Sequence, residues 1–376
     1  MRPGLLAGLA CVALAACGTG SPTPITTPAP TQTVGAQSTP SGPATPTATG
    51  TTVPSAPRPT ASVAPTSTPG AIGWTARSDV ARGPAARPDH TWTVAGDVAS
   101  LFGGLTADGP ANDLWSVDLA TDQWHVLHPS GSAPAPRFGH TATWVPNVGL
   151  VVWSGQGDTF FDDIWTYDPA VDAWHELPSL GDVPEARYGS CASLGPDGRL
   201  WISHGFTQDD GRFADTRAYD FATGEWTDMT PSGDVPVKRC LHDCFWAPGD
   251  RLILYGGQTT GVPALGDIWS YDLATSTWTE GVGSGAPARQ LYALAAFEPE
   301  THGVLVFGGG DLERGYLGDT WALDWGSLQL QSLGIGDGPS ARSGATLITA
   351  PDGRYLLFGG QNNDGLMSDI WELSAH

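Results

Sequence analysis

The sequence predicts an all-β domain built from six similar units, and three observations support this prediction. Similar segments recur with a period near 50 residues between residues 71 and 376. Within each segment, short runs of alternating β-branched and aromatic residues are separated by turn signals, without a helix-length period. Gly, with 50 residues, and Trp, with 16, are both abundant, as expected where tight turns surround a few large core side chains.

The composition excludes several classes of protein. The formal net charge is −22, and such an acidic surface repels phosphate backbones, so we expect no nucleic-acid partner. After the first 20 residues, no apolar run approaches the roughly 20 residues that a membrane helix needs. We expect a monomer that contacts the membrane only through a lipid anchor.

The N-terminus carries the features of an export signal. Residues 1–16 combine a positive start with an apolar stretch, which fits a signal peptide better than a membrane span. The stretch ends in Leu14-Ala15-Ala16-Cys17, which resembles the lipobox of bacterial lipoproteins. That resemblance implies acylation of Cys17 and anchoring at the bacterial cell envelope, with the domain facing outward or periplasmic. The alternative is an ordinary secretory signal cut after Ala16.

Residues 17–70 form a predicted disordered stalk. This segment is rich in Thr, Pro and Ser, contains no aromatic residue and has a single charge, at Arg58. It cannot bury enough apolar surface to offset its ordering entropy. The Pro content favours an extended, semi-rigid spacer.

Each segment of the remaining chain carries the same markers in the same order. An Arg opens the segment, an apolar strand ending in one or two Gly follows, and an Asp then stands two residues before a Trp. The arginines are Arg87, Arg137, Arg187, Arg239, Arg289 and Arg342. The aspartates are Asp113, Asp163, Asp215, Asp267, Asp319 and Asp369. In the third segment, Arg217 stands where the other segments have the Trp.

The diglycine, the spaced Trp residues and the 50-residue period resemble the kelch repeat, which forms one four-stranded blade of a β-propeller. Six repeats in register imply a six-bladed kelch β-propeller over residues 71–376, in the superfamily that includes the central domain of galactose oxidase. The last segment has three strands before His376, and Gly73–Arg77 matches the fourth strand of other segments. We expect this N-terminal strand to complete the last blade, closing the ring without a free sheet edge.

Three cysteines lie in the repeats, at Cys191, Cys240 and Cys244. We place them on the first strands of adjacent blades, which run side by side around the central channel. Outside the cytoplasm one disulfide can form, between Cys191 and either Cys240 or Cys244. Cys240 and Cys244 would lie about 13 Å apart along one strand, too far to bond each other.

Two recurrent sets of residues are candidates for the mouth of the channel. The six arginines would form a ring able to bind an anion, although hydrogen bonds to the six aspartates and to turn carbonyls are the more economical interpretation. Three residues after each Arg, the blades carry His90, His140, Ser190, His242, Tyr292 and Ala345. We interpret the histidines as structural pairs, because a shared metal would need three imidazole nitrogens within about 2.1 Å of one point.

No cofactor and no metal site are predicted. Copper would suit the channel histidines, and calcium would suit the acidic loop residues Asp158, Asp162, Asp209 and Asp210, but the sequence shows no defined ligand spacing for either ion. Galactose oxidase-like copper enzymes and sialic acid epimerases also contain kelch repeats. No set of residues here matches their active sites, so no catalytic residue is assigned.

The loops that join the second to the third strand of each blade, and each outer strand to the next blade, form the face on which propellers normally bind. We select Phe160, Arg212, Arg314 and Tyr316 on this face as candidate binding residues, because aromatic and Arg side chains are enriched at binding hot spots. The sequence therefore predicts a surface-anchored, non-catalytic binding module for an extracellular protein or glycan. The alternative is a carbohydrate-active or copper-dependent enzyme, sialic acid epimerase-like or galactose oxidase-like, with its site at the top of the channel.

Overall fold

The computed structural model describes residues 72–77, 83–208, 211–283, 285–297, 303–311, 313–324 and 326–375. The predicted signal peptide (1–16), Cys17, the stalk (17–70), Asp209 and Asp210 lie outside these residues. All regular secondary structure within the described residues consists of β-strands. None of the described segments forms a helix long and apolar enough to cross a membrane.

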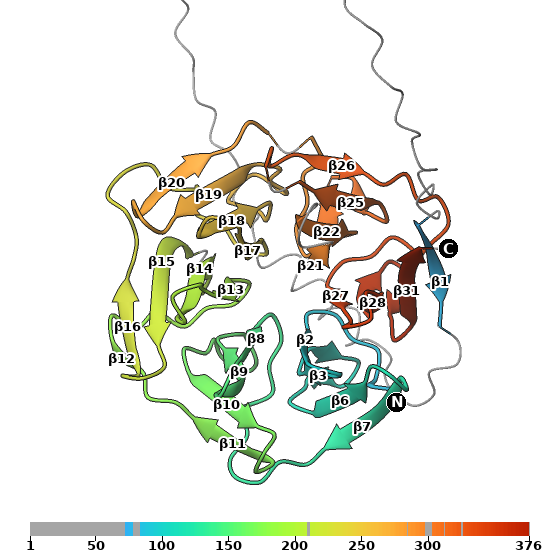
Figure 1. The fold of residues 1–376 in the computed structure, drawn as a ribbon, viewed down its shortest axis with the longest axis horizontal. Coiled ribbons are helices and arrows are strands. Elements are labelled where there is room, and N and C mark those ends of the chain that lie inside the picture. Colours follow the sequence, from blue (N-terminus) through green and yellow to red (C-terminus); the bar gives the residue numbers. More distant parts are fainter. Residues whose placement is uncertain are drawn as a thin grey trace, which may run out of the picture. The chain divides into compact units, whose positions relative to one another are not determined.

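The strands form six antiparallel blades around a central channel, confirming the predicted propeller (Figure 1). Blade 1 comprises β2 (Thr91–Ala95), β3 (Val98–Phe102), β6 (Leu114–Asp118) and β7 (Gln123–Leu127) from the channel outward. Blade 2 comprises β8 (Thr141–Val145), β9 (Gly149–Trp153), β10 (Ile164–Asp168) and β11 (Ala173–Glu176). Blade 3 comprises β13 (Cys191–Leu194), β14 (Leu200–Phe206), β15 (Arg212–Asp220) and β16 (Glu225–Asp228), with β12 (Leu180–Gly181) added in parallel at its outer edge.

The other three blades repeat this order. Blade 4 comprises β17 (Asp243–Ala247), β18 (Arg251–Tyr255), β19 (Ile268–Asp272) and β20 (Thr277–Glu280). Blade 5 comprises β21 (Ala293–Phe297), β22 (Gly303–Phe307), β25 (Thr320–Leu323) and β26 (Leu330–Ser332). Blade 6 comprises β27 (Thr346–Thr349), β28 (Tyr355–Phe358), β31 (Ile370–Ala375) and β1 (Ile72–Ala76). Short hairpins extend the loops of three blades: β4 (Leu105–Thr106) with β5 (Gly109–Pro110), β23 (Gly310–Asp311) with β24 (Gly315–Tyr316), and β29 (Gln361–Asn362) with β30 (Gly365–Leu366).

The N-terminal strand closes the ring, as the sequence predicted. Strand β1 pairs with β31 in antiparallel register, with Trp74 opposite Leu373, and lies at the outer edge of blade 6 (Figure 1). The Trp74 indole donates a hydrogen bond of 3.0 Å to the Thr320 hydroxyl of blade 5. Arg77 forms ion pairs with Glu372 of blade 6 and Asp122 of blade 1, so the closing strand ties three blades together.

Backbone hydrogen bonds at one end of the channel join every blade to the next. Four blades have a diglycine at this place, and in blades 2 and 3 Ser154 and His204 take its first position. In all six blades the Gly at the second position donates its N–H to the carbonyl of the Arg that opens the following blade, at 2.9 Å. A Cβ at Gly104 would lie 2.7 Å from the Cβ of His90, and its φ is +98°. Both the close approach and the positive φ require glycine at this position.

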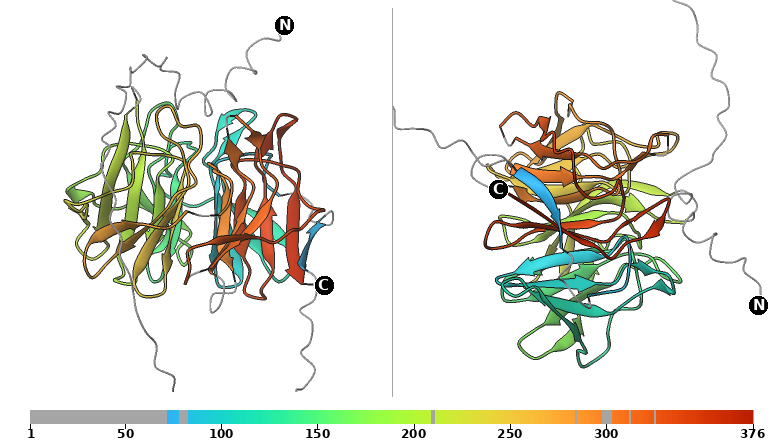
Figure 2. Two further views of the ribbon diagram at one scale, coloured as in Figure 1. Left: turned by 90° about the horizontal axis from the view of Figure 1, so that it is seen from above. Right: turned by 90° about the vertical axis from the view of Figure 1, so that its right-hand side faces the viewer.

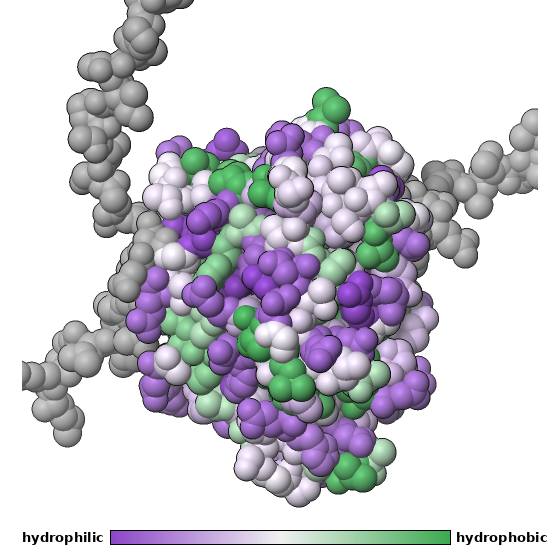
Figure 3. Space-filling model, turned by 90° about the vertical axis from the view of Figure 1, so that its left-hand side faces the viewer, coloured by the Kyte–Doolittle hydropathy of each residue, from purple (hydrophilic) through white to green (hydrophobic). Residues whose placement is uncertain are grey.

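The core consists of apolar layers between neighbouring blades. Between blades 2 and 3, the rings of Trp153 and Trp226 lie 5.6 Å apart within one buried cluster. In blade 5, Leu330 takes the outer position that Trp occupies in other blades, and only 5% of it is exposed. Figure 2 shows the strands running between the two faces of the propeller, and apolar and hydrophilic residues are intermixed on the side seen in Figure 3. The loops at each face therefore project from a closed ring of blades with a densely packed core.

Candidate functional site

The six repeat arginines are the most regular polar feature of the propeller. Each guanidinium donates two hydrogen bonds to the repeat Asp of its own blade, at N–O distances of 2.6–3.1 Å. Each also donates to the carbonyl of the first residue of the Gly pair and to a carbonyl two residues before the Arg. None of these side chains lines the channel cavities among the described residues. The arginines hold the loops of each blade, as the structural interpretation proposed.

The Trp that follows each repeat Asp completes this arrangement. In five blades its indole N–H donates to the Asp carboxylate, at 2.6–2.8 Å. In blade 3 the Nε of Arg217 donates to Asp215 instead, at 3.2 Å. Burial raises the pKa of Asp215, but hydrogen bonds and charges from Arg187 and Arg217 outweigh this effect and hold the pKa below its usual value. Arg217 thus replaces the Trp as a donor.

A closed ring of backbone hydrogen bonds narrows the loop-side end of the channel. In each blade the residue two after the Arg donates its N–H to the carbonyl of the equivalent residue in the preceding blade, at 2.7–3.0 Å. The six residues are Asp89, Gly139, Gly189, Leu241, Leu291 and Gly344. All six have a φ between +51° and +66°, a conformation that is uncommon for residues other than Gly. The ring holds the backbone in place, so that the residue after each ring position lines the channel.

The histidines of blades 1 and 2 each bond to a Thr of the preceding blade rather than pairing with each other. The Nε2 of His90 lies 2.6 Å from the Thr346 hydroxyl of blade 6, and the Nε2 of His140 lies 2.9 Å from the Thr91 hydroxyl of blade 1. Each imidazole packs edge-on against the Phe that precedes the diglycine of the neighbouring blade. Burial and the charge of Arg87 lower the pKa of His90 to about 3. These imidazoles are therefore neutral hydrogen-bonding partners between blades.

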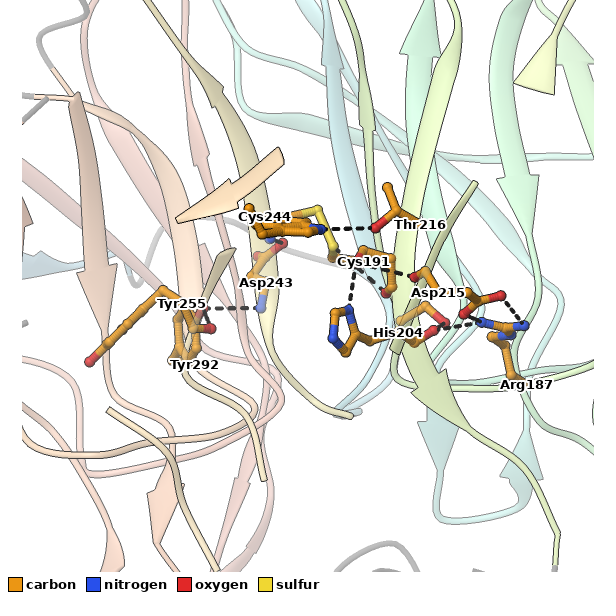
Figure 4. The surroundings of a disulfide bond; sticks show 12 residues. Arg187, Cys191, His204, Asp215, Thr216, Asp243, Cys244, Tyr255 and Tyr292 are labelled. Carbon is orange, nitrogen blue, oxygen red and sulfur yellow. Dashed lines mark hydrogen bonds and ion pairs between the residues drawn. A yellow bond between two sulfur atoms is a disulfide. The ribbon is translucent and has the colours of Figure 1, made fainter. Parts of the chain in front are cut away.

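The boundary between blades 3 and 4 departs from this pattern. Cys191 stands at the position of Thr91 and forms a disulfide with Cys244, with a Cα–Cα distance of 5.5 Å (Figure 4). His204 replaces the first Gly of the pair with φ +58°, is fully buried, and contacts the Ser203 hydroxyl through Nδ1 at 2.6 Å. Its ring centroid lies 5.4 Å from that of His242. The blade junction is covalent here.

His242 has lost the partner that the other channel histidines use. Its side chain is buried, and neither ring nitrogen makes a hydrogen bond of normal geometry within the described part of the chain. Burial, together with His204 and Arg239, lowers its pKa well below the usual value, and the Ser203 backbone opposes this shift in part.

Cys240 does not lie on the strand where the sequence analysis placed it. It precedes β17, makes an isolated bridge with Gln258, and is buried outside the disulfide.

Two carboxyl groups of the channel were not selected from the sequence. Asp89 is 7% exposed, neither of its carboxylate oxygens has a partner among the described residues, and burial raises its pKa to about 6. Asp243, from blade 4, accepts the Cys244 N–H at 2.8 Å, and burial raises its pKa to about 6. The signal in the sequence was a local departure from the repeat. Asp89 stands where three blades have Gly, and Asp243 stands where three blades have Thr.

The hydroxyl groups of the channel are engaged by neighbouring groups. The Tyr292 hydroxyl donates to the Tyr255 carbonyl at 2.8 Å and accepts the Asp243 N–H at 3.0 Å. The Ser190 hydroxyl donates to the His204 carbonyl at 2.9 Å. No group of three His, Cys, Asp or Glu side chains able to hold a metal ion occurs among the described residues. The arrangement offers acids and neutral imidazoles, and the Thr91 and Thr346 hydroxyls bond to the imidazoles of His140 and His90.

The four candidate rim residues fall into two pairs. Phe160 is half-buried against Tyr188 and Phe206, while Arg212 is 5% exposed and donates to the Thr260 hydroxyl at 2.8 Å. These two side chains pack inward, because an apolar cluster covers this part of the loop face.

Arg314 and Tyr316 belong to the hairpin formed by β23 and β24. The Arg314 side chain is 60% exposed, and Tyr316 is half-buried. The acidic loop residues Asp158 and Asp162 are also exposed. Of the four candidates, Arg314 is exposed on the loop face, while Tyr316 and Phe160 are half-buried and Arg212 is buried.

Another cavity of the described structure lies on the loop face between blades 6 and 1. It has a volume of about 580 Å³. Its lining consists of Ala85, Ala86, Arg87, Thr106, Ala107, Asp108, Ala111, Asp113 and Leu366. These are mostly small side chains from the β4–β5 hairpin and from the segment before β2. Sequence reasoning missed this depression because small residues carry no binding signal of their own.

Comparison with known proteins agrees with this architecture. Residues 68–205 and 247–376 match the family model described as the KLHDC2/KLHL20/DRC7 Kelch-repeats domain. Acyl-CoA-binding domain-containing protein 5 of Arabidopsis thaliana is 28% identical over 180 residues, 46% of this chain and 27% of that protein. Kelch domain-containing protein 2 of Bos taurus is 33% identical over 104 residues, 26% of this chain and 25% of that protein. The matched parts thus span about a quarter of these relatives, while the family model covers well over half of the chain. The chain belongs to the kelch-repeat family of β-propellers.

Proposed function

We propose that this chain is a surface-anchored, non-catalytic binding module that holds an extracellular protein or glycan on its loop face. Kelch propellers are commonly protein-binding modules. The observation that carries the proposal is the depression of about 580 Å³ between blades 6 and 1, which lies on this face and is walled by small side chains. Arg314 adds an exposed cationic group to the same face, and the half-buried Tyr316 adds an aromatic ring beside it.

The distribution of exposed apolar side chains supports this choice of face. Large apolar residues that remain exposed mark interaction surfaces when they gather on one side of a protein. Three of those found here, Val237, Val262 and Val282, lie in connections at the loop face, whereas Leu180 belongs to β12 at the outer edge of blade 3. Val282 is 95% exposed at the tip of the connection between blades 4 and 5. A partner that covers this face would remove these side chains from water.

Two features support export and anchoring. The Leu14-Ala15-Ala16-Cys17 sequence resembles a lipobox, and a disulfide between Cys191 and Cys244 is typical of proteins that fold outside the cytoplasm. On this proposal the Pro/Thr-rich segment holds a monomeric propeller away from the membrane. Palmitate labelling of the wild type, and its loss in Cys17→Ser, tests the anchor.

Site-specific photo-crosslinking in intact cells tests the binding face. A photoreactive residue replaces Ala107, beside the depression, and in a matched variant it replaces Val98, exposed in the same blade at the opposite end of β3. We expect a discrete crosslinked product from position 107 and none from position 98. Protease and glycosidase digestion of the product then separates a protein partner from a glycan. Equal crosslinking from both positions, or crosslinking from position 98 alone, would contradict the proposal.

An enzyme working in the channel is the second candidate, favoured by the convergence of Asp89, Asp243 and the channel histidines on one space. It would be carbohydrate-active or copper-dependent. Thermal midpoints measured with sugars, sialic acids and copper test it, since a ligand at about 100 times its Kd adds roughly 2.7 kcal/mol of stability. A shift with one of these compounds, followed by its chemical conversion, would replace the binding-module proposal.

A further inference from the structure

The depression between blades 6 and 1 lies where smaller side chains replace the rings found at another blade boundary. Between blades 2 and 3, the rings of Phe160, Tyr188 and Phe206 pack against one another with centroids 5.8–6.2 Å apart. At the boundary between blades 6 and 1, the equivalent positions carry smaller side chains: Leu366, Pro88 and Leu105. The volume of about 580 Å³ lies within the range of roughly 300–1,000 Å³ that is typical of ligand sites. The depression can therefore hold side chains of a partner.

The wall of the depression is mostly aliphatic. Four alanines line it from the segment before β2 and from the loop that carries the β4–β5 hairpin, and Leu366 lines it from blade 6. The alanines are Ala85, Ala86, Ala107 and Ala111. No aromatic ring occurs among the described residues that line it. Such a wall fits the methylene stem of a Lys or Arg side chain, which packs along apolar surface while its charged end stays near water.

The only cation in the described lining, Arg87, is not available to a ligand. Its side chain is buried and donates two hydrogen bonds to the Asp113 carboxylate, which itself stays one-third exposed, at 33%. Burial raises the pKa of Asp113, but hydrogen bonds from Arg87 and Trp115 outweigh this effect and hold the pKa below its usual value. Asp113 is therefore ionised at neutral pH, and the depression offers carboxylates to a ligand but no free positive charge.

Two hairpins with the same turn sequence stand beside the depression. The β4–β5 hairpin turns at Asp108-Gly109 and the β29–β30 hairpin at Asp364-Gly365, and both aspartates are exposed. The Thr106 hydroxyl holds the first turn, because it donates to the Gly109 carbonyl at 2.9 Å and accepts the Asp108 N–H at 3.2 Å. Elsewhere on the loop face, exposed acids at Asp158, Asp162, Glu185 and Glu313 stand against exposed cations at Lys238 and Arg314. The field over this face therefore favours a positively charged partner.

We propose that the depression binds a basic segment of a protein partner, with a Lys or Arg side chain lying along the alanine wall and its charged end at Asp108 and Asp113. This inference rests on the proposed binding face and chooses between its two classes of partner. A neutral glycan gains nothing from the charge of the rim, and an acidic glycan is repelled by it. The aliphatic wall requires a stem as well as a charge, which distinguishes this ligand from an inorganic cation.

Titration calorimetry on the full-length protein tests the proposal with the end-blocked peptide Ala-Lys-Ala-Lys-Ala. The same peptide with acetylated lysines is the neutral control, and Ala-Glu-Ala-Glu-Ala is the anionic one. We expect saturable one-to-one binding of the lysine peptide alone. Asp108→Asn should raise its Kd about twofold to fivefold, the usual effect of losing one exposed ion pair. Asp97→Asn, which removes an exposed carboxyl at the opposite end of the same blade, should leave the Kd unchanged.

Ala85→Phe separates a shaped site from general attraction to an acidic surface. The substitution fills the depression without changing the charge, so it should raise the Kd at least as much as Asp108→Asn. Position 85 is exposed, so we expect both variants to fold, and unchanged thermal midpoints verify this. The proposal is overturned if the lysine peptide does not bind, or if the acetylated peptide binds equally well. It is also overturned if Asp108→Asn and Asp97→Asn change the Kd equally, or if folded Ala85→Phe leaves it unchanged.

Crosslinking from position 107 keeps this inference apart from the proposed function. A discrete product from position 107, together with failure of the lysine peptide to bind, would retain the binding face and overturn the basic segment. A product that glycosidase degrades and protease does not would have the same meaning. Binding of the lysine peptide without any product from position 107 would retain the chemistry of the depression and contradict the proposed function in cells.

Discussion

The boundary between blades 1 and 2 and the boundary between blades 3 and 4 use the same positions in different ways. Both share the backbone bond from a Gly N–H to the next repeat Arg carbonyl, at 2.9 Å. At the first boundary a Thr91–His140 hydrogen bond and the edge of Phe102 complete the contact. At the second, the Cys191–Cys244 disulfide takes the place of Thr91, and neither ring nitrogen of His242 makes a hydrogen bond of normal geometry to any described residue. The backbone frame is thus held constant, while the channel side chains are free to differ.

We expect the largest effect on stability from the repeat Arg–Asp pairs, which both boundaries share. Arg137→Ala at the first boundary and Arg239→Ala at the second each remove a fully buried guanidinium, its ion pair with a partly buried carboxylate and its hydrogen bonds to two loop carbonyls. We expect each substitution to lower the free energy of unfolding by about 3–5 kcal/mol, measured by urea denaturation. Arg314→Ala, at an exposed Arg, should change it by less than about 0.5 kcal/mol. If all three substitutions changed the free energy of unfolding by similar amounts, the Arg–Asp pairs of the repeat would contribute little to stability.

We expect the next largest effect on stability from the disulfide, which is present only at the boundary between blades 3 and 4. Reduction of the disulfide, or the double substitution Cys191→Ala with Cys244→Ala, should lower the free energy of unfolding by about 2–4 kcal/mol. The doubly substituted protein should be insensitive to dithiothreitol, which serves as the control. A wild type whose denaturation midpoint is the same with and without dithiothreitol would rule out a stabilising disulfide.

The sequence revealed the shared frame more fully than the differences. The arginines, their aspartates and the closing strand follow from markers that recur in every blade, so pattern alone located them. His242 becomes notable only because Cys191 replaces the Thr that faces the equivalent His of blade 2. A single sequence does not show which groups face each other. Arg212 has an exposed type of side chain, yet it packs inward because Phe206 and Thr260 lie beside it.

The buried histidines make both boundaries sensitive to acid. Burial holds the pKa of His140 and His242 well below the value of about 6.5 expected in the unfolded chain. The unfolded chain therefore takes up protons first as the pH falls through 6.5, and each histidine removes up to about 1.4 kcal/mol of stability per pH unit. Asp89 acts in the opposite direction: its folded pKa of about 6 lies above its unfolded value, so its contribution is lost as the pH rises from 4 to 6. We expect a net loss of stability on acidification.

Denaturation at a series of pH values checks this expectation. His242→Gln should reduce the slope of stability against pH, between pH 6.5 and 6, by about 0.9 kcal/mol per unit, because an unfolded histidine is on average about two-thirds protonated in this range. His140→Gln should reduce it equally, although it should also lower stability at pH 7.5 because it disturbs the hydrogen bond to Thr91. An unchanged slope in both variants would mean that these histidines are not protonated on unfolding.

The smallest effect comes from converting the second boundary into the first. Cys191→Thr with Cys244→Ala places in blade 3 the hydroxyl that Thr91 offers to His140, and in blade 4 the Ala that blade 2 has at the equivalent position. The new Thr should pair with His242, because its position relative to that ring is the same. Compared with Cys191→Ala and Cys244→Ala, which lacks the hydroxyl, this variant should be more stable by about 0.5–1.5 kcal/mol, the usual contribution of one hydrogen bond. Urea denaturation of the two double variants measures the difference directly. Equal stabilities would show that His204 and Ser203, which replace the Gly and Phe of the other boundary, hold the His242 ring away from this position.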